Sequence, residues 1–547
     1  MKHKYIIITV FTILCFTFPS CVDFDKHYEG EAQDLSQIED TENAVPARAE
    51  AALNGMYALL GRPGVCFPKN DPLRADDFGY PALALSQDIN AGIIITEVSG
   101  YDWFSVCSEF SDRIPNYANP TMRYSLPYKV IFATKGVLDA ISDDTDSPDA
   151  IARRGQAKAM RAWAYLSLAP YFQFRYALDP SALSVPITVP GSDLNNNPRA
   201  LLEDLYAYIL EDLDNAIADL EGFVRPHKGQ IVQSVAYGLR ARAYMYMEKW
   251  VEAAADAEKA LIGYTPYSIT EVSTPTFYES SHKSWMWGII LPSSLIGETL
   301  LSWPSQIGSF SGSAYTAYAV YRQINKRLYD KISDTDVRKG WWLNESKQSP
   351  LLNGLCWEPT TIGGVVYTAC DQDIVGLVIP DTKIAMPAYS NVKFGQRRGI
   401  GSPYNEGDWC MMRAEEMILI RAEALYKSGQ QALGQAVLVD FVTTYRDPSY
   451  TLVGNFENEV WMQRRIELWG EGFAMADAMR LGKNIVRFVQ GQPTNVPEDY
   501  RFNIAANDPW LLLRFVNAEL SNNMGVVQNT GGSQPNPGDG GGLTDGL

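Results

Sequence analysis

The chain has 547 residues and a formal net charge of −18, and no dense run of Lys or Arg interrupts this acidic balance. Binding to nucleic acid is therefore disfavoured, because a phosphate backbone needs a basic surface, and docking on acidic lipid is disfavoured for the same reason. The length easily supports a large core, either as one body or as two or three domains.

Residues 1–20 have the pattern of an export signal, with a basic start and an apolar run of 14 residues that ends just before a small-residue approach to a cysteine. That run is shorter than the roughly 20 residues that cross a bilayer, so we expect cleavage rather than a membrane span. The pattern resembles a bacterial lipoprotein signal and predicts lipid attachment at Cys21, with an ordinary cleaved signal as the alternative. Residues 21–45 are acidic and aperiodic, as expected of a tether.

Several segments of the N-terminal half carry apolar residues at steps of three and four, which predicts amphipathic helices. Pro46 suits the first turn of a helix, and Asn197-Pro198 is expected to open another. The predicted helices cover residues 46–60, 123–141, 152–176 and about 198–220.

Residues 237–262 place aromatic and small residues where a tetratricopeptide helix pair packs them. A weaker copy of this pattern covers residues 413–442. Two separated copies do not make a continuous solenoid, but they favour a scaffold of helical hairpins. The predicted fold class is therefore mainly α, built on tetratricopeptide-like hairpins.

Between these copies, residues 263–410 form a loop-rich insertion dominated by Gly, Pro, Ser, Thr and aromatic residues, with short β-prone pieces. Loops on a rigid helical body are a common place for binding sites. Cys356 and Cys370 flank a predicted hairpin here and could form a disulfide. The Gly/Pro-rich residues 531–547 are predicted to be a flexible tail.

Catalytic and metal-binding motifs are not found in the sequence, which has only four histidines and no zinc-site spacing. Glu467 and Glu471 lie one turn apart on a predicted helix, so they cannot face each other across a glycosidic bond. Helical spacing instead predicts ion pairs of Arg464 with Glu467 and of Asp477 with Arg480. We expect neither enzyme activity nor a metal or cofactor.

The order of several motifs resembles the SusD/RagB family, the surface lipoproteins of Bacteroidetes that work with a TonB-dependent outer-membrane transporter. The resemblance covers nearly the whole chain after the signal. It rests on residues 48–60, 153–172, 328–342, 392–395, 413–429 and 464–483 together with the helix pair after Gln230.

The resemblance implies an N-terminal SusD-like region over residues 46–262 and a C-terminal RagB/SusD region over residues 263–530. It also implies a protein lipid-anchored in the outer membrane and facing outward, which captures a glycan and delivers it to a SusC-like transporter. Two alternatives stay open: capture of a peptide, as by RagB, and a helical-repeat scaffold that binds only protein.

Aromatic residues make up 12% of the chain, and two stretches combine them with carboxylates or loops. Flat rings can stack on a sugar face while carboxylates accept its hydroxyl groups. The resemblance to the SusD/RagB family implies that loops from the same two stretches form the ligand-binding surface. The candidate ligand-binding residues, predicted as a group, are Asp77, Tyr101, Asp102 and Trp103 in the first stretch and Trp285, Trp287, Tyr315 and Trp341 in the second.

Overall fold

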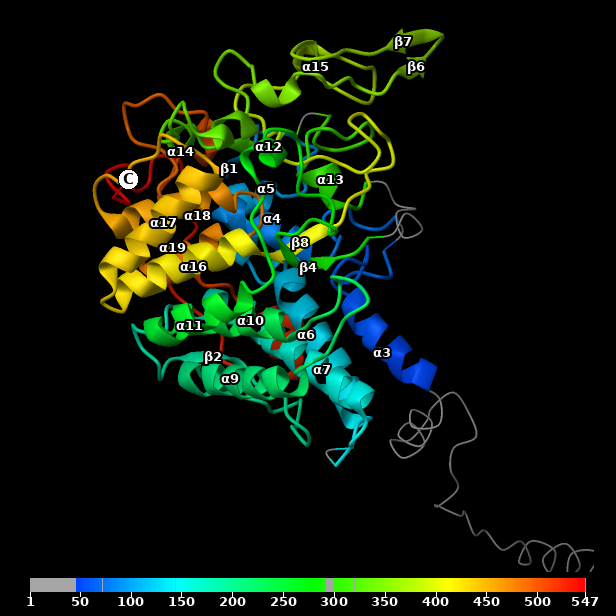
Figure 1. Cartoon of the computed structure of the whole chain (residues 1–547), viewed down its shortest axis with the longest axis vertical. Coiled ribbons are helices and arrows are strands. Elements are labelled where there is room, and N and C mark those ends of the chain that lie inside the picture. Colours follow the sequence, from blue (N-terminus) through cyan, green and yellow to red (C-terminus); the bar gives the residue numbers. More distant parts are fainter. Residues whose placement is uncertain (1–45, 71, 143, 292–299, 319, 547) are drawn as a thin grey trace, which may run out of the picture. The chain divides into compact units, whose positions relative to one another are not determined.

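The computed structural model describes residues 46–547, apart from residues 71, 143, 292–299, 319 and 547. The signal, Cys21 and the tether therefore lie outside the described residues. Residues 51–547 form one compact unit, in which helices dominate and the strands are short and paired in twos (Figure 1). The predicted mainly α fold class is confirmed, whereas the division at residue 262 stays a prediction.

A ladder of helices forms the scaffold, and each helix of the ladder packs against its neighbour: α6 on α7, α7 on α9, α9 on α10, α10 on α11, α11 on α16, and α16 on both α17 and α18. The helices are α6 (Ala118–Asp139), α7 (Pro148–Leu166), α9 (Leu202–Asp219), α10 (Gln233–Tyr246), α11 (Trp250–Ala260), α16 (Ala414–Lys427), α17 (Gln431–Tyr445) and α18 (Phe456–Glu467).

Local sequence explains why these helices form and pack. Ser147 caps α7 by accepting a hydrogen bond from the Ala150 N–H, and Pro148 occupies the first turn. Along α9, the apolar residues at steps of three and four are all buried, including Leu205, Ile209 and Leu213. The apolar stripe that was read from the sequence is thus the buried face of the ladder.

The predicted start of α9 is wrong by several residues, because long-range contacts fix Asn197-Pro198 outside the helix. The Asn197 N–H donates to Asn523 Oδ1 at 2.8 Å, and the Asn197 side chain donates to the Ile187 carbonyl at 3.0 Å. The next residues form the short strand β3 (Arg199–Leu201), which pairs with β2 (Leu183–Pro186). The helix then begins at Leu202.

The two tetratricopeptide-like pairs, α10–α11 and α16–α17, stack directly on each other although the whole insertion separates them in sequence (Figure 1). Buried Arg242 of α10 binds the carboxylate of Glu416 on α16 through Nε and Nη2, at 2.5 and 2.6 Å. Arg421 of α16 reaches Glu258 of α11 at 2.9 Å. The insertion therefore loops out of an otherwise continuous stack, which the sequence did not indicate.

Short strands and helices organise the insertion. Strand β4 (Trp285–Ile289) pairs antiparallel with β8 (Trp409–Arg413) and so joins the two ends of the insertion, while β1 (Ile94–Ile95) pairs with β5 (Gln323–Ile324). The other elements of this region are α12 (Ile269–Val272), α13 (Trp303–Gln306), α14 (Lys326–Tyr329), η3 (Val337–Trp341), η4 (Pro350–Leu352) and α15 (Asp373–Gly376).

A hairpin of β6 (Thr360–Ile362) and β7 (Val365–Tyr367) extends from the body at the top of Figure 1. Gly363 and Gly364 form its turn with φ of 58° and 79°, a left-handed conformation that favours glycine. At its base, Cys356 and Cys370 form a disulfide, so the pairing suggested by the sequence is confirmed.

Replacing both disulfide cysteines with Ser is expected to loosen this hairpin and leave the helical ladder intact. The bond closes a loop with a sequence separation of 14, and it limits the freedom of the opened hairpin. We expect amide exchange in residues 356–370 to rise about 10- to 100-fold, as measured by mass spectrometry. Equal exchange in the variant and the wild type would contradict this expectation.

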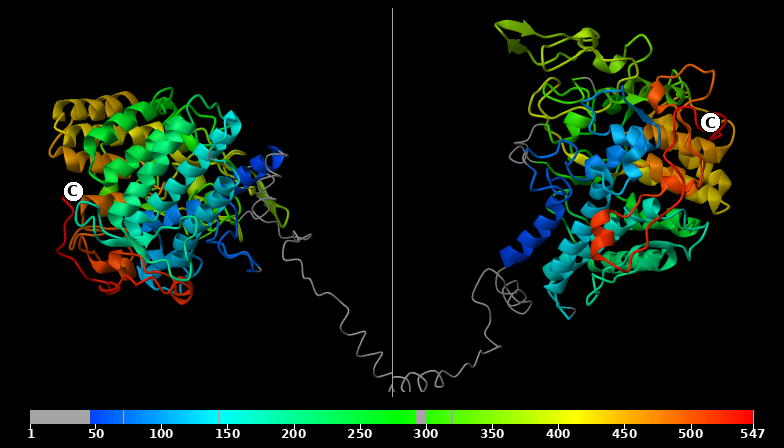
Figure 2. Two further views of the ribbon diagram at one scale, coloured as in Figure 1. Left: turned by 90° about the horizontal axis from the view of Figure 1, so that it is seen from below. Right: turned by 180° about the vertical axis from the view of Figure 1, so that it is seen from behind.

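The remaining α-helices are α3 (Pro46–Ala58), α4 (Tyr80–Asn90), α5 (Ser105–Ser108), α8 (Ala169–Phe172), α19 (Ala474–Leu481) and α20 (Asn517–Asn522). The C-terminal segment lies against the body (Figure 2). Asp545 is buried and pairs with Arg327, and the Gly538 N–H donates to the Arg501 carbonyl at 2.7 Å. These contacts give residues 531–546 a defined position, so the predicted flexible tail is corrected to a docked one.

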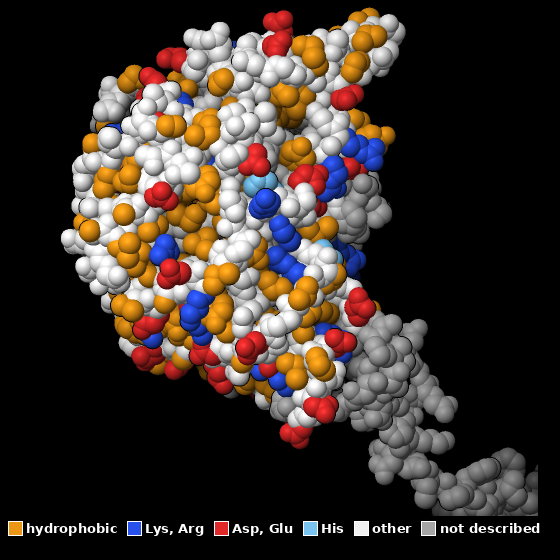
Figure 3. All heavy atoms as spheres, in the orientation of Figure 1, with side chains coloured by type: hydrophobic (Ala, Val, Ile, Leu, Met, Phe, Trp, Pro, Cys, Tyr) orange, Lys and Arg blue, Asp and Glu red, His pale blue; other side chains and the backbone are white. Residues whose placement is uncertain are grey.

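Over the described residues, no helix is both long and apolar enough to span a bilayer. On the face shown in Figure 3, basic side chains form only a short row among acidic and neutral ones. This face lacks, among its described residues, the broad basic field that a phosphate backbone needs.

Candidate ligand-binding site

Two tyrosines from distant parts of the chain form an aromatic pair at the surface. Tyr101 lies in the loop between β1 and α5, and its side chain is 53% exposed. Its ring meets that of Tyr318 edge to face, with centroids 5.3 Å apart. The neighbouring Tyr101 hydroxyl raises the pKa of Tyr318. The pair therefore presents one exposed ring, that of Tyr101, and one half-buried ring, that of Tyr318.

Trp103 extends this aromatic surface and carries a cation beside it. The Arg74 guanidinium lies 5.1 Å from the Trp103 ring centroid and 5.5 Å from that of Phe67. Its Nε and Nη2 each donate at 3.0 Å to the carboxylate of buried Asp76. We call Phe67, Arg74, Tyr101, Trp103 and Tyr318 the ring surface; a rigid arrangement of this kind presents flat faces and a hydrogen-bond donor together.

Asp102 holds the ring surface in place and is not itself exposed to a ligand. Its carboxylate accepts from Arg322 Nη1 at 3.0 Å and Nη2 at 3.1 Å, and from the Phe104 N–H at 2.9 Å. Asp102 and Arg322 are both buried. The predicted ligand contact is therefore corrected to a positioning role, because the ion pair fixes the loop that carries Tyr101 and Trp103.

Asp77 has a similar positioning role one loop away. Its buried carboxylate accepts hydrogen bonds from the N–H groups of Cys66 and Phe67, at 2.9 and 2.8 Å. Burial raises the pKa of Asp77. Asp77 was predicted to contact a ligand, but in the structure its role is to support the fold. Its hydrogen bonds set the position of Phe67 beside Arg74.

Three of the predicted aromatic residues, Trp285, Trp287 and Trp341, are core residues with no exposed side-chain surface. Each indole N–H is satisfied inside the protein: Trp285 donates to the Tyr267 hydroxyl at 2.8 Å, and the other two donate to backbone carbonyls at 3.2 and 3.0 Å. The prediction that they contact a ligand is wrong, because β4, which carries Trp285 and Trp287, is buried along its whole length, and Trp341 is a buried residue of η3.

Tyr315 is half-buried, and its backbone shapes the loop that carries Tyr318. The Tyr315 carbonyl accepts from the N–H groups of Tyr318 and Val320, both at 3.2 Å. The structure thus brings Tyr101, Trp103 and the Tyr315 loop together, whereas the other predicted residues support them or lie in the core.

A cleft of about 700 Å³, which we call the hydroxyl cleft, is lined in part by Ser313 and Thr382. These residues belong to two segments that are joined by the hydrogen bond from the Ile384 N–H to the Ala317 carbonyl, next to Tyr318. Asp381, which contributes to the raised pKa of Tyr318, precedes Thr382 on the wall of this cleft. Six of its lining side chains carry a hydroxyl group, one of them the exposed ring of Tyr404, and the cleft also contains one carboxylate and one guanidinium. The residues with these groups are Ser313, Glu358, Thr360, Thr361, Thr382, Arg398, Ser402 and Tyr404.

Arg398 in the hydroxyl cleft repeats the arrangement of Arg74. Its guanidinium lies 4.3 Å from the Tyr404 ring centroid, and its Nε donates to the buried Glu406 carboxylate at 3.0 Å. Arg74, Arg398 and Tyr404 are not among the residues predicted from the sequence. Arg74 and Arg398 pair with carboxylates only two and eight positions away, but the Trp103 ring beside Arg74 comes from another loop, which the local sequence does not indicate.

Glu467 and Glu471 belong to a buried ion-pair network rather than to a catalytic pair. Glu467 binds Arg446 and Arg413, each at 2.7 Å, and Glu471 binds Arg413 at 2.9 Å and Lys393 at 2.7 Å. Burial alone would raise the pKa of Glu467, but the Arg446 and Arg413 guanidiniums hold it well below its usual range. Neither acid is a proton donor at neutral pH.

One of the two predicted ion pairs is confirmed and the other is wrong. Asp477 binds Arg480 at 2.8 Å, which confirms that pair, but Arg464 binds Asp477 at 2.7 Å instead of Glu467. Arg464 and Asp477 are buried, so the pairing is part of the core rather than of a helix surface.

Acid is expected to unfold the protein through this network. The pKa of Glu467 is lowered in the folded state. Its contribution to the free energy of unfolding is therefore fully present above the pKa of about 4.3 that Glu has in the unfolded chain, and it is lost as the pH falls. Glu471 and Asp477 have lowered pKa values as well. The melting temperature should therefore drop steeply below about pH 4. A constant melting temperature between pH 5 and pH 3 would contradict this account.

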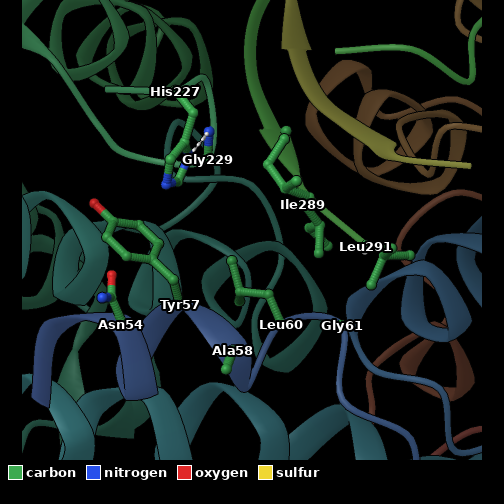
Figure 4. A pocket seen from close by; sticks show the side chains of 11 residues that line it. Asn54, Tyr57, Ala58, Leu60, Gly61, His227, Gly229, Ile289 and Leu291 are labelled. Atoms are coloured by element: carbon green, nitrogen blue, oxygen red, sulfur yellow. Dashed lines mark hydrogen bonds between the residues drawn. The ribbon is translucent and has the colours of Figure 1, made fainter. Parts of the chain in front are cut away.

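A smaller apolar cleft of about 270 Å³ differs in character from the ring surface (Figure 4). His227 and Tyr57 lie on one side of it, and Ile289 and Leu291 on the other. The Tyr57 hydroxyl is already used, since it donates to Gln156 and accepts from the Ile231 N–H. This cleft offers few free polar groups to a sugar. In the described part of the chain, no group of His, Cys, Asp and Glu side chains could hold a metal ion.

Comparison with protein families finds two matches, which together cover more than half of the chain. A model described as starch-binding and associating with the outer membrane matches residues 96–245, and the SusD family model matches residues 380–531. No curated protein sequence matches the chain.

Solved structures share the whole fold. A SusD-like carbohydrate binding protein from Bacteroides vulgatus has 23% identity and a TM-score of 0.68, over 88% of this chain and 97% of that chain. A SusD superfamily protein from Bacteroides thetaiotaomicron has 19% identity and a TM-score of 0.67, over 88% and 99%. A laminarin binding SusD-like protein has 17% identity and a TM-score of 0.56, over 89% and 99%. The two family matches and this shared fold establish that the chain belongs to the SusD/RagB family.

Proposed function

We propose that this protein captures a glycan at the cell surface and delivers it to a SusC-like TonB-dependent transporter. Family membership supports the class of function, and the ring surface supports the class of ligand. The identity of the glycan is left open, because stacking on rings recognises the shape shared by many sugars.

The observation that carries this proposal is an exposed set of rings held by buried ion pairs. Tyr101 and Trp103 stay at the surface because Asp102 and Arg322 fix their loop, and Arg74 is fixed by Asp76. Clustered exposed apolar side chains are common at interaction sites. Rings and adjacent guanidinium groups together suit a sugar, whose faces are apolar and whose edges carry hydroxyls.

The hydroxyl cleft beside the ring surface suits a longer chain. Its hydroxyl groups, Glu358 and Arg398 can accept from and donate to successive sugar units. A glycan that stacks on Tyr101 and Trp103 would continue into this cleft. Recognition would be non-covalent, and we propose no hydrolysis, because the paired Glu467 and Glu471 are buried and ionised.

Titration of residues 22–547 with a panel of plant and host polysaccharides, followed by tryptophan fluorescence, tests the ligand class. Quenching by at least one glycan, recovered uncut after long incubation, is the expected result. A response to mixed peptides but to no glycan would favour capture of a peptide, as by RagB. No change of fluorescence with either glycans or peptides would favour a protein-binding scaffold.

We also propose that Cys21 carries the lipid that holds the protein in the outer membrane, facing outward. The acidic residues that follow it in the sequence would serve as the tether. Labelled fatty acid should enter the wild type and fail to enter the Cys21→Ala variant. Incorporation that survives this substitution would overturn the assignment.

A further inference from the structure

The β6–β7 hairpin supplies part of the lining of the hydroxyl cleft. Residues 359–361, which we call the hairpin wall, line this cleft and include Thr360 and Thr361. Residues 401–404, which also line it, belong to a separate loop. The width of the cleft therefore depends on where the hairpin stands relative to that loop.

Most of the hairpin is held only weakly by the body. Among the described residues, no hydrogen bond joins residues 359–367 to any residue outside the hairpin. Ile362 and Tyr367 pack in part against the core, whereas Val365 and Val366 are 53% and 60% exposed. A two-stranded hairpin is marginally stable by itself in water, so its position depends on its base.

The disulfide is the covalent part of that base. The Cys356–Cys370 bond joins the two arms of the hairpin. Next to it, Trp357 has no exposed surface and donates its backbone N–H to the Ala369 carbonyl at 2.8 Å. The Thr368 hydroxyl donates to the Trp357 carbonyl at 2.8 Å. The disulfide thus closes the arms around a buried ring.

The base also contacts the other segments that line the cleft. The Glu358 N–H donates to the Ile400 carbonyl at 3.0 Å. Gly401 has a φ of 84° and lies so close to Trp357 that a Cβ there would stand 2.7 Å from the indole Nε1. Lys383, which follows a cleft-lining threonine, places its Nζ 5.3 Å from the Trp357 ring centroid. Three segments that line the cleft therefore meet at this ring.

The hairpin wall offers hydroxyl groups and no charge. Residues 359–370 contain no charged side chain, although 20% of the whole chain is charged. Thr360 and Thr361 can each donate and accept a hydrogen bond. This wall can therefore bind the hydroxyl groups of a neutral glycan, and it provides no counter-charge for an anionic one.

We propose that the Cys356–Cys370 disulfide positions the hairpin wall for glycan binding and that Thr360 and Thr361 contact a neutral glycan there. The inference rests on the proposed function, because it concerns how the hydroxyl cleft holds its ligand. A wall that is already fixed does not have to be ordered when the ligand binds, which favours affinity. Without the disulfide, only a fraction of the molecules would have the wall in place, and the apparent affinity would fall by that fraction.

Affinity electrophoresis of residues 22–547 in gels of soluble starch, laminarin, xyloglucan, galactomannan or polygalacturonate tests this role. At least one neutral polysaccharide should retard the wild type. Cys356→Ser/Cys370→Ser and Thr360→Ala/Thr361→Ala should each bind it at least about fivefold more weakly. Val365→Ala is the matched control, because Val365 is exposed on the same hairpin but does not line the cleft, and its affinity should stay within about twofold.

Amide exchange separates a local effect of the disulfide from general unfolding. In the cysteine variant, exchange should rise in residues 356–370 and stay unchanged in α7 and α10. In the wild type, the bound polysaccharide should slow exchange in residues 356–370. A loss of affinity with faster exchange in α7 and α10 would overturn the positioning role, because the disulfide would then support the whole fold.

Tyr101→Ala/Trp103→Ala separates this inference from the proposed function. If that variant loses affinity while either hairpin variant binds like the wild type, the inference is overturned and capture by the ring surface stands. Retardation of the wild type by polygalacturonate alone would also overturn the inference and leave glycan capture. No retardation of the wild type in any of the five gels would overturn both.

Discussion

Glu467→Gln is expected to destabilise the protein by about 3–5 kcal/mol, a large share of the roughly 5–15 kcal/mol that holds a typical domain folded. The Glu467 carboxylate faces three buried arginines, with Arg446 and Arg413 at 2.7 Å and Arg338 at 3.2 Å. An amide cannot neutralise them, so buried positive charge would be left without its counter-charge. Guanidinium unfolding of the variant and the wild type measures the loss.

Glu457→Gln is the matched control on the same helix, α18. Glu457 pairs with Lys427, but its side chain is 45% exposed, so water already screens the pair. The expected change in the free energy of unfolding is below about 1 kcal/mol. If the two variants lose similar amounts, the network around Glu467 is not the stabilising centre that its burial implies.

Tyr101→Ala/Trp103→Ala is expected to weaken glycan binding about 30- to 150-fold. Two stacked rings contribute about 2–3 kcal/mol together, and this loss of free energy corresponds to that range of affinity. The fold should be unaffected, since Tyr101 and Trp103 are 53% and 37% exposed. Calorimetry with a glycan from the panel measures the change.

Phe132→Ala provides the control for the ring variants. Phe132 is 46% exposed on α6 and belongs to neither the ring surface nor the hydroxyl cleft. Its removal should leave the affinity within about twofold. A similar loss of affinity in both variants would mean that exposed aromatic area in general, and not the ring surface, controls binding.

The helices were predictable because their signals are local. Apolar spacing over residues 46–60 and 237–262 corresponds to α3, α10 and α11, since a helix needs only neighbouring residues to bury one face. The stacking of α11 on α16 was not predictable, because the pairs meet across the insertion. The docked tail was missed for a similar reason: Asp545 finds Arg327 far away in the chain.

The candidate site was predictable only as a group of residue types. Tyr101 and Trp287 look alike in sequence, because each stands among aromatic neighbours, yet one is exposed and the other has no exposed surface. Burial depends on what packs above a residue, and for Trp287 this is set by distant segments. Asp102 next to exposed rings suggested a ligand contact, but its partner Arg322 is 220 positions away.

Affinity electrophoresis of residues 22–547 in gels that contain single polysaccharides tests the central claim most directly. The account predicts that at least one polysaccharide retards the wild type and that Tyr101→Ala/Trp103→Ala migrates there as it does in an empty gel. Equal retardation of the variant and the wild type, or no retardation in any gel, would contradict capture of a glycan by the ring surface.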